Sequence, residues 1–453
     1  MKMTDQTFMK EKNVLQLVLS MSLPMVISMA VNALYNIIDS YFVAKVSEDA
    51  MTALALVFPI QNLVNAIAIG FGVGINAVIA FYLGAGDEMQ ANKAATLGTL
   101  LSFLHGILMM SVCIVGMPFF LRSFTSDQEM IALALTYSNR VFLFASITTV
   151  GLSFEKIFQA MGRMKATMIC MMSGCVANII LDPLMILGIG FFPKMGMAGA
   201  AYATGIGQCI TLISYLMFYA ICHMPVRVGR SYVSLDKTIL KKLYVIGTSA
   251  TLNLALPSLL ISVLNRLLVD FSGKYVLVLG VYYKLQTFIY LTANGIIQGI
   301  RPLIGYNFGA GEHERVKKIF RIALTMNMGI MLLGMGLSWV IPERLIGLFT
   351  DSAETIEIGR TALHRISLGF AISAISITCS GALEGLGKGF SSLIISMMRY
   401  VLVIMPAAYL LSRVMGANGV WLAFAFTEFV TALAAALIYR RETKISPQKK
   451  IQL

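Results

Sequence analysis

The sequence predicts an all-α polytopic membrane protein with twelve transmembrane helices in two pseudo-symmetric six-helix lobes. Three observations predict this fold class: an apolar composition, twelve long apolar runs, and a repeat that relates the two halves. Of the 453 residues, 58% are hydrophobic and only 13% are charged, whereas soluble domains average about 25% charged residues. This composition excludes a soluble enzyme, a disordered chain and a secreted disulfide scaffold.

Twelve runs are long enough to cross a bilayer, since a span needs roughly 20 mostly apolar residues. The runs of the first half cover 14–43, 51–83, 95–120, 131–158, 166–191 and 198–223. The runs of the second half cover 240–270, 276–305, 319–341, 356–383, 391–412 and 418–439. The first run is too long for the apolar core of a cleaved signal peptide, so we expect it to be a membrane helix.

The distribution of basic residues predicts the orientation of the chain. With the N-terminus assumed inside, 21 Lys and Arg residues lie in inside segments and 8 in outside segments. The positive-inside rule then places both termini in the cytoplasm, and we expect a bacterial plasma membrane. The net charge of +13 therefore reflects membrane topology and not nucleic-acid binding. The predicted parts are a cytoplasmic N-terminus (1–13), an N-lobe (14–223), a cytoplasmic connector (224–239), a C-lobe (240–439) and a basic cytoplasmic tail (440–453).

The two halves match at a constant offset of 225 residues. Gly70 pairs with Gly295, and the loop triplet Gly-Ala-Gly at 84–86 recurs at 309–311. Each half contains six spans, an even number, so both halves enter the membrane from the same side. This predicts a parallel repeat about an axis along the membrane normal, a plan common in transporters, with the binding site between the halves.

Polar residues cluster inside the first and fifth spans: Asn32, Tyr35, Asn36, Asp39, Asn178 and Asp182. The i, i+4, i+7 spacing of Asn32, Asn36 and Asp39 puts them on one face of the first helix. An ionisable group in the bilayer costs at least a few kcal/mol and indicates function by default. Asp39 and Asp182 lie at a similar depth, so they can share one cavity. Two close carboxylates in a low dielectric do not both ionise cheaply, so one takes a proton or a cation lies between them. The alternative is that each acid only accepts hydrogen bonds from a neighbouring helix.

Further residues are candidates for a substrate cavity: Gln61, Asn65, Met172, Lys284 and Gln286. Amides at such positions often only hold helices together, and methionines often only pack, although a Met-lined wall suits varied apolar ligands. The positions that correspond to the two acids in the second half are Leu264 and Ala407. Coupling chemistry is therefore expected in the first half alone.

The second half carries intramembrane cations, Arg266, Lys284, Arg301 and Arg399, at other positions. We expect Arg399 to be structural, and Glu384 and Glu428 to pair with Lys or Arg across helices. The chain has no phosphate-binding loop, its four histidines are isolated, and its six cysteines lack metal-ligand spacing. We therefore expect no enzymatic activity and no cofactor.

Four motifs resemble those of the MATE (multidrug and toxic compound extrusion) transporters. Residues 33–39 (Ala-Leu-Tyr-Asn-Ile-Ile-Asp), 178–183 (Asn-Ile-Ile-Leu-Asp-Pro) and 199–204 (Gly-Ala-Ala-Tyr-Ala-Thr) resemble parts of the first, fifth and sixth helices of the family. Residues 298–311 (Gln-Gly-Ile-Arg-Pro-Leu-Ile-Gly-Tyr-Asn-Phe-Gly-Ala-Gly) resemble its most recognisable stretch. The resemblance covers essentially the whole chain.

The resemblance implies a V-shaped pair of lobes that exports lipophilic, often cationic compounds in exchange for H⁺ or Na⁺. It implies an N-lobe ion site at Asp39, Asn178, Asp182 and Thr204, of which the first three would hold Na⁺ in a sodium-coupled protein. The family's fourth-helix Asn is absent here, and Glu155 and Lys156 stand near its position. Glu155 replaces the amide as an ion ligand, or the Glu–Lys pair neutralises itself.

The sequence therefore predicts a secondary multidrug antiporter whose coupling acids lie in the N-lobe. One alternative is a lipid-linked glycan flippase of the related superfamily, in which the second-half cations hold a pyrophosphate. A second alternative is a channel or a structural membrane protein, although no segment resembles a selectivity filter. The expected partners are small drug-like compounds and membrane lipids, and one chain forms the complete two-lobed unit, which favours a monomer.

Overall fold

The computed structural model describes residues 6–190 and 192–444, and every regular element in this part of the chain is a helix. Residues 1–5 and 445–453, which belong to the predicted terminal segments, lie outside the described residues. So does residue 191, the last of the fifth predicted span.

The N-lobe is built from the first eight α-helices. They are α1 (Phe8–Glu11), α2 (Val14–Ala44), α3 (Glu48–Gly84), α4 (Glu88–Arg122), α5 (Gln128–Leu143), α6 (Ala145–Ala160), α7 (Met164–Leu187) and α8 (Met197–Ile221). A short 3₁₀ turn, η1 (Arg230–Tyr232), lies in the connector to the second lobe.

The C-lobe contains the remaining helices. They are α9 (Lys237–Val269), α10 (Gly273–Gly309), α11 (His313–Val340), α12 (Pro342–Gly347), α13 (Ala353–Ser367), α14 (Phe370–Gly385), α15 (Gly389–Met397), α16 (Ile404–Met415) and α17 (Ala417–Thr443). A π-helical turn, η2 (Met398–Leu402), joins α15 to α16.

The described residues confirm the predicted number of spans. Ten helical stretches are long and apolar enough to cross a membrane, with α15, η2 and α16 counted as one stretch. Two further spans are bent pairs: α5 with α6, at 46°, and α13 with α14, at 53°. The sequence predicted these pairs as the continuous spans 131–158 and 356–383. The bends therefore add a break within each span and leave the count at twelve.

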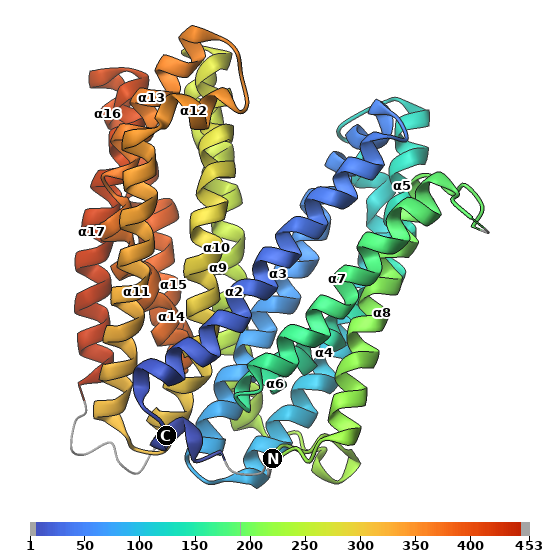
Figure 1. The fold of residues 1–453 in the computed structure, drawn as a ribbon, viewed down its shortest axis with the longest axis vertical. Helices are drawn as coiled ribbons and strands as arrows, with labels where there is room; N and C mark the ends of the chain where they lie inside the picture. The colour runs from blue at the N-terminus through green and yellow to red at the C-terminus, as the bar shows by residue number, and fades with distance from the viewer. Residues whose placement is uncertain (1–5, 191, 445–453) are drawn as a thin grey trace.

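The two lobes diverge as a V (Figure 1). Helix α1 and the C-terminal end of α17 both lie at the narrow end, where the lobes meet. The lobes join through two long helix pairs, because α3 of the N-lobe packs on α9 and α2 packs on α10 of the C-lobe. The wide end of the V leaves the opposite ends of these helices separated (Figure 1).

Glycine contacts at the lobe interface obey the repeat offset of 225 residues. A Cβ on Gly84 would fall 1.9 Å from the carbonyl oxygen of Tyr306, and a Cβ on Gly309 would fall 2.1 Å from that of Phe81. Each residue of the first pair is 225 positions from its counterpart in the second. Close backbone approach therefore requires glycine on both sides of the interface, and the predicted parallel repeat is confirmed.

The repeat also extends to the ends of the helices. Ser47 and Ser272 accept backbone hydrogen bonds at the N-termini of α3 and α10, as polar N-caps do. Gly86 and Gly311 follow the C-terminal ends of the same two helices with φ of 75° and 77°, a left-handed conformation that glycine adopts readily. The recurring loop triplet therefore forms the same turn in both lobes.

Candidate functional site

A cavity of about 770 Å³, lined by many polar side chains, lies in the N-lobe, within the range of about 300–1,000 Å³ typical of small-molecule sites. Its wall is formed by α2, α3, α5, α6, α7 and α8. Among the described residues that line it, Lys284 of α10 alone comes from the C-lobe. The largest part of the site thus lies inside one lobe, and the second lobe supplies a cation at its edge.

Most of the residues that the sequence singled out meet in this wall. Those lining the cavity are Asn32, Tyr35, Asn36, Asp39, Gln61, Asn65, Glu155, Asn178, Thr204 and Lys284. Asp182 lies behind the wall and has no exposed surface. The i, i+4, i+7 face predicted for the first span is therefore the face of α2 that points into the cavity.

Two predicted cavity residues lie elsewhere. Met171, and not Met172, is in the wall, because adjacent residues of a helix point about 100° apart. Gln286 follows Lys284 by two positions and so points to another side of α10. Its amide donates to the hydroxyl of Tyr282 at 2.8 Å, one turn back along the same helix.

Asn178 links α7, which also carries the fully buried Asp182, to α8. With its amide nitrogen oriented toward Asp182, Asn178 donates to the Oδ2 atom at 3.0 Å and accepts from the backbone N–H of Thr204 at 3.1 Å. The pair Asn178 and Asp182 is one helical turn apart on α7, and Thr204 lies on α8. The structure thus brings these three predicted site residues into one hydrogen-bonded group.

Asp39 faces this group from α2 and lacks a complete set of partners. Its side chain is largely buried, and its Oδ1 atom has no hydrogen-bond partner among the described residues. Burying an unpaired carboxylate is costly, so this group favours a bound proton or cation.

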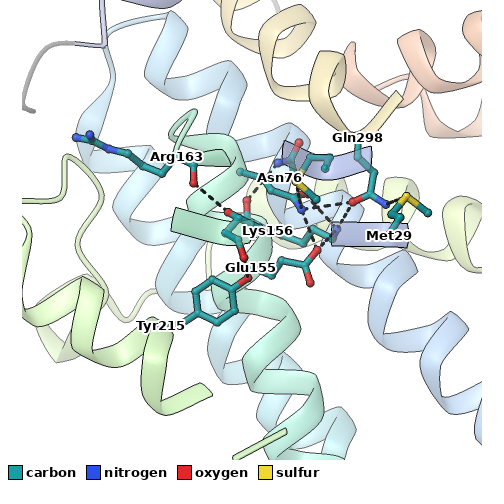
Figure 2. A network of polar contacts seen from close by, with 10 residues as sticks. Met29, Asn76, Glu155, Lys156, Arg163, Tyr215 and Gln298 are labelled. Carbon is teal, nitrogen blue, oxygen red and sulfur yellow. Dashed lines mark hydrogen bonds and ion pairs between the residues drawn. The ribbon is translucent and has the colours of Figure 1, made fainter. Parts of the chain in front are cut away.

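A polar network ties α6 of the N-lobe to α10 of the C-lobe (Figure 2). The Nζ atom of Lys156 donates to Glu155 at 2.6 Å, to Gln159 at 3.1 Å and to Gln298 of α10 at 3.4 Å. Gln159 also donates to the same Glu155 oxygen at 2.8 Å. Gly72 of α3 leaves space for this lysine, because a Cβ there would fall 2.8 Å from the Cγ atom of Lys156.

The network shows how the carboxylate of Glu155 is bonded. Its carboxylate lines the N-lobe cavity, yet one oxygen accepts from both Lys156 and Gln159. The Glu155 and Lys156 side chains are 7% and 3% exposed, so solvent screens the pair little. The Glu–Lys pair therefore neutralises itself, the second of the two arrangements considered from the sequence.

A second, smaller cavity of about 330 Å³ lies in the C-lobe, on the other side of the network. Ile69 lines both cavities, while Glu155 lines the first and Lys156 the second. Arg301 and Glu384, which also line the second cavity, pair at 2.6 Å. The ion pair between Glu155 and Lys156 thus forms part of the wall between the two cavities.

The pairing expected for the C-lobe acids is confirmed. Glu384 pairs with Arg301, and Glu428 pairs with Arg399 at 2.6 Å. Arg399 also donates to the hydroxyl of Tyr290 at 2.6 Å. Each arginine reaches a helix other than its own, so these pairs hold the C-lobe together.

Sequence reasoning missed several residues of the N-lobe cavity. Gln208 and Thr211 line it beside Thr204, and their i+4 and i+7 spacing is the signal that identified the polar face of the first span. Tyr137 of α5 also lines it. A tyrosine in an apolar run carries no comparable signal, because buried tyrosines are common in cores.

Metal-ligand chemistry is limited in the part of the chain that the structure describes. It contains no group of three or more His, Cys, Asp or Glu that could hold a metal ion. A hard cation needs several oxygen ligands. Near Asp182, however, the amide of Asn178 presents its nitrogen and directs its oxygen to the backbone of Thr204. This hydrogen bond therefore occupies the amide oxygen of Asn178.

Twelve spans in two parallel repeats, with a polar cavity and buried acids inside one lobe, define a multi-pass membrane transporter. The sequence model of the MatE family matches residues 24–184 and 263–410. The chain therefore belongs to the MatE family, the MATE transporters, as its motifs suggested.

Curated relatives are similar over nearly the whole chain. The multidrug export protein MepA of Staphylococcus aureus is 26% identical over 446 residues, which cover 96% of this chain and 95% of that protein. MepA of Staphylococcus saprophyticus is 24% identical over 439 residues, covering 97% and 96%. Both relatives are thus matched over nearly their whole length.

Solved structures share the fold. A MATE transporter described as being in an outward-facing conformation has a TM-score of 0.91 at 23% identity, covering 98% of this chain and 99% of the other. A MATE structure in a bent conformation gives the same score and identity, covering 97% and 98%. At this identity the likeness shows the fold alone.

Proposed function

We propose that this chain is a secondary-active multidrug antiporter that exports lipophilic, often cationic compounds in exchange for protons. The observation that carries the proposal is a drug-sized cavity that Asp39 lines, with the buried Asp182 bonded to Asn178 behind its wall. The multidrug export named for the relatives supports the substrate class. No ATP-binding motif is present, so an ion gradient is the energy source we infer.

We infer that the narrow end of the V faces the cytoplasm of a bacterial cell and that both termini lie there. The excess of Lys and Arg in the segments at this end supports the orientation. The wide end then opens outward, and alternating access requires the lobes to close at the wide end and part at the narrow one. One chain contains both lobes and the whole cavity, which supports a monomer within the lipid.

In the proposed cycle, Asp39 and Asp182 bind the coupling ion from outside and release the drug. A cationic drug then displaces the ion from the inward-open cavity, because Asp39, which lines the cavity, neutralises either ligand. Proton coupling is supported by the hydrogen bond that occupies the amide oxygen of Asn178 and by the ion pair that occupies Glu155. Both features remove oxygen ligands that a sodium ion would need.

The proposal is tested by efflux of ethidium from proteoliposomes under a pH gradient and, separately, under a Na⁺ gradient. We expect the pH gradient to drive efflux in the wild type and not in Asp39→Asn. Asp49→Asn removes an exposed acid at the start of α3 and is the matched control, expected to leave efflux unchanged. Efflux driven by Na⁺ alone would overturn proton coupling. Translocation of a lipid-linked glycan without ethidium transport would instead establish the flippase.

A further inference from the structure

Polar and charged side chains line part of the C-lobe cavity, and the proposed antiport cycle does not use this cavity. It lies between α9, α10, α14, α15 and η2, and α2, α3 and α6 close it on the N-lobe side. Its volume of about 330 Å³ is at the lower end of the range for small-molecule sites. It therefore suits a ligand much smaller than a typical drug.

The charges in this wall are unequal. Three cations line the cavity, Lys156, Arg301 and Arg399, but Glu384 is the one acid among the described lining residues. The partners of the other two cations, Glu155 and Glu428, do not line it. The side chains that line the cavity thus carry more positive than negative charge, although each cation forms an ion pair with an acid.

The wall also offers a hydrogen-bond donor that is not in use. The Nε atom of Arg301 is buried and has no hydrogen-bond partner among the described residues, because its ion pair with Glu384 uses another nitrogen of the guanidinium group. An unpaired buried donor costs about 1–3 kcal/mol. Since this atom has almost no exposed surface, an acceptor in the cavity reaches it when the guanidinium group turns toward the cavity.

The backbone beside the cavity is irregular at the residue that carries the second arginine. Arg399 and Tyr400 line the cavity from the π-helical turn η2. Such turns are rare and occur frequently at functional sites. This local irregularity places a cation in the C-lobe cavity independently of the Arg301 pair.

Apolar side chains form the rest of the wall, including Met29, Leu254, Ile297 and Ile377. A ligand that satisfies both parts of the wall has an anionic head and a compact apolar body. We propose that the C-lobe cavity is a second ligand site, which takes small lipophilic oxyanions such as aromatic carboxylates. The carboxylate lies against Arg301, Arg399 and Lys156, and the apolar body lies against the aliphatic residues.

Occupancy of this site changes the N-lobe cavity through Lys156. An oxyanion competes with Glu155 for the lysine, which lines the C-lobe cavity while its partner lines the other. A carboxylate released from Lys156 is then free to neutralise a cation in the N-lobe cavity. The two sites are therefore coupled, and by linkage each ligand tightens the binding of the other.

The test is calorimetric titration of the purified full-length protein with benzoate, in nanodiscs of phosphatidylcholine. We expect saturable binding that weakens at least tenfold in the double variant Arg399→Gln/Glu428→Gln, which removes a cation together with its partner. The matched control, Arg360→Gln/Glu357→Gln, removes an exposed ion pair and is expected to bind benzoate as the wild type does. Absence of saturable binding to the wild type would overturn the proposal, as would equal binding by the two double variants.

A cavity-filling variant keeps the test valid if the double variant does not fold. Ser396 lines the cavity, and Ser396→Leu leaves the three ion pairs intact, so it is expected to block benzoate by volume alone; undiminished binding would contradict the proposed location. Titration with inorganic phosphate, and with benzoate in phosphatidylglycerol nanodiscs, separates the sources of the oxyanion. Competition from phosphatidylglycerol would identify a lipid headgroup as the natural occupant. All titrations are repeated with Asp39→Asn, which is expected to lack antiport. Benzoate binding that is retained in this variant separates the second site from the proposed antiport function.

Discussion

Glu155 and Lys156 are adjacent in sequence and form an ion pair of 2.6 Å, yet they line different cavities. The pair lies where α6 of the N-lobe meets α10 of the C-lobe, and Lys156 reaches Gln298 across that contact. The charge state of this pair therefore bears on both cavities and on the contact between the lobes.

Breaking this ion pair from one side is expected to destabilise the protein. Lys156→Met leaves the Glu155 carboxylate buried and unpaired, which costs roughly 3–5 kcal/mol of unfolding free energy. The double variant Glu155→Gln/Lys156→Met removes both charges and is expected to recover most of that loss. Thermal unfolding in detergent measures both variants. A Lys156→Met protein as stable as the wild type would show that the pair does not hold a buried charge.

The repeat predicts matched effects of alanine at symmetry-related glycines. Gly84→Ala and Gly309→Ala each force a Cβ into the backbone of the opposite lobe, and overpacking of this kind costs about 1–3 kcal/mol. Gly116→Ala is the control, because a Cβ there meets no atom within 4 Å. It is expected to be neutral or slightly stabilising. Thermal unfolding measures all three variants. If only one of Gly84→Ala and Gly309→Ala is destabilised, the two glycines do not have equivalent roles at the lobe interface.

The N-cap of α9 predicts a pH dependence outside the membrane. Backbone N–H groups of Thr238 and Ile239 bond to Asp236 and lower the pKa of its carboxyl. The cap therefore stabilises the helix start above the ordinary aspartate pKa, and this contribution is lost as the pH falls through the lowered value.

Hydrogen exchange in the first turn of α9 measures this effect. Asp236→Ala is expected to open that turn by about 1 kcal/mol at neutral pH, and the difference from the wild type should shrink in strong acid, where the neutral carboxyl is a weaker cap. Asp236→Asn keeps a capping oxygen that does not titrate, so it is expected to protect the turn at both pH values. A defect of Asp236→Ala that persists undiminished in acid would rule out the charged cap.

Asn178 is expected to support the deepest acid. Asn178→Leu removes the donor to Asp182 and the acceptor for Thr204, leaving a buried carboxyl without its partner. The expected cost is about 1–3 kcal/mol, with loss of pH-driven ethidium efflux. Asn62→Leu changes another amide of the same cavity wall and is expected to retain coupling. Wild-type efflux by Asn178→Leu would remove the residue from the coupling site.

Much of the fold was predictable from the sequence because hydropathy and the repeat act over long stretches. The offset of 225 residues predicted parallel halves, and the contacts of Gly84 and Gly309 follow it. The bend between α5 and α6 was not predictable, since residues 131–158 contain no proline that would indicate a break. A break of this kind depends on packing against other helices.

The candidate site was predictable where polar residues share a helical face, as Asn36 and Asp39 do. Helical spacing alone did not settle which of two neighbours faces the cavity, so Met172 was expected in the wall where Met171 lies. The pairing of Glu155 with Lys156 was considered because the two residues are adjacent in the sequence. The hydrogen bond from Lys156 to Gln298 joins positions 142 residues apart in the chain, and no local sequence pattern predicts such a contact.

The central claim is that the N-lobe acids exchange protons for drug. The most direct measurement is proton release when ethidium binds to the purified protein in weakly buffered detergent solution, followed with a pH-sensitive dye. The account predicts proton release by the wild type and by Asp49→Asn, and none by the double variant Asp39→Asn/Asp182→Asn. Ethidium binding by the wild type without proton release, or equal release by the double variant, would contradict it.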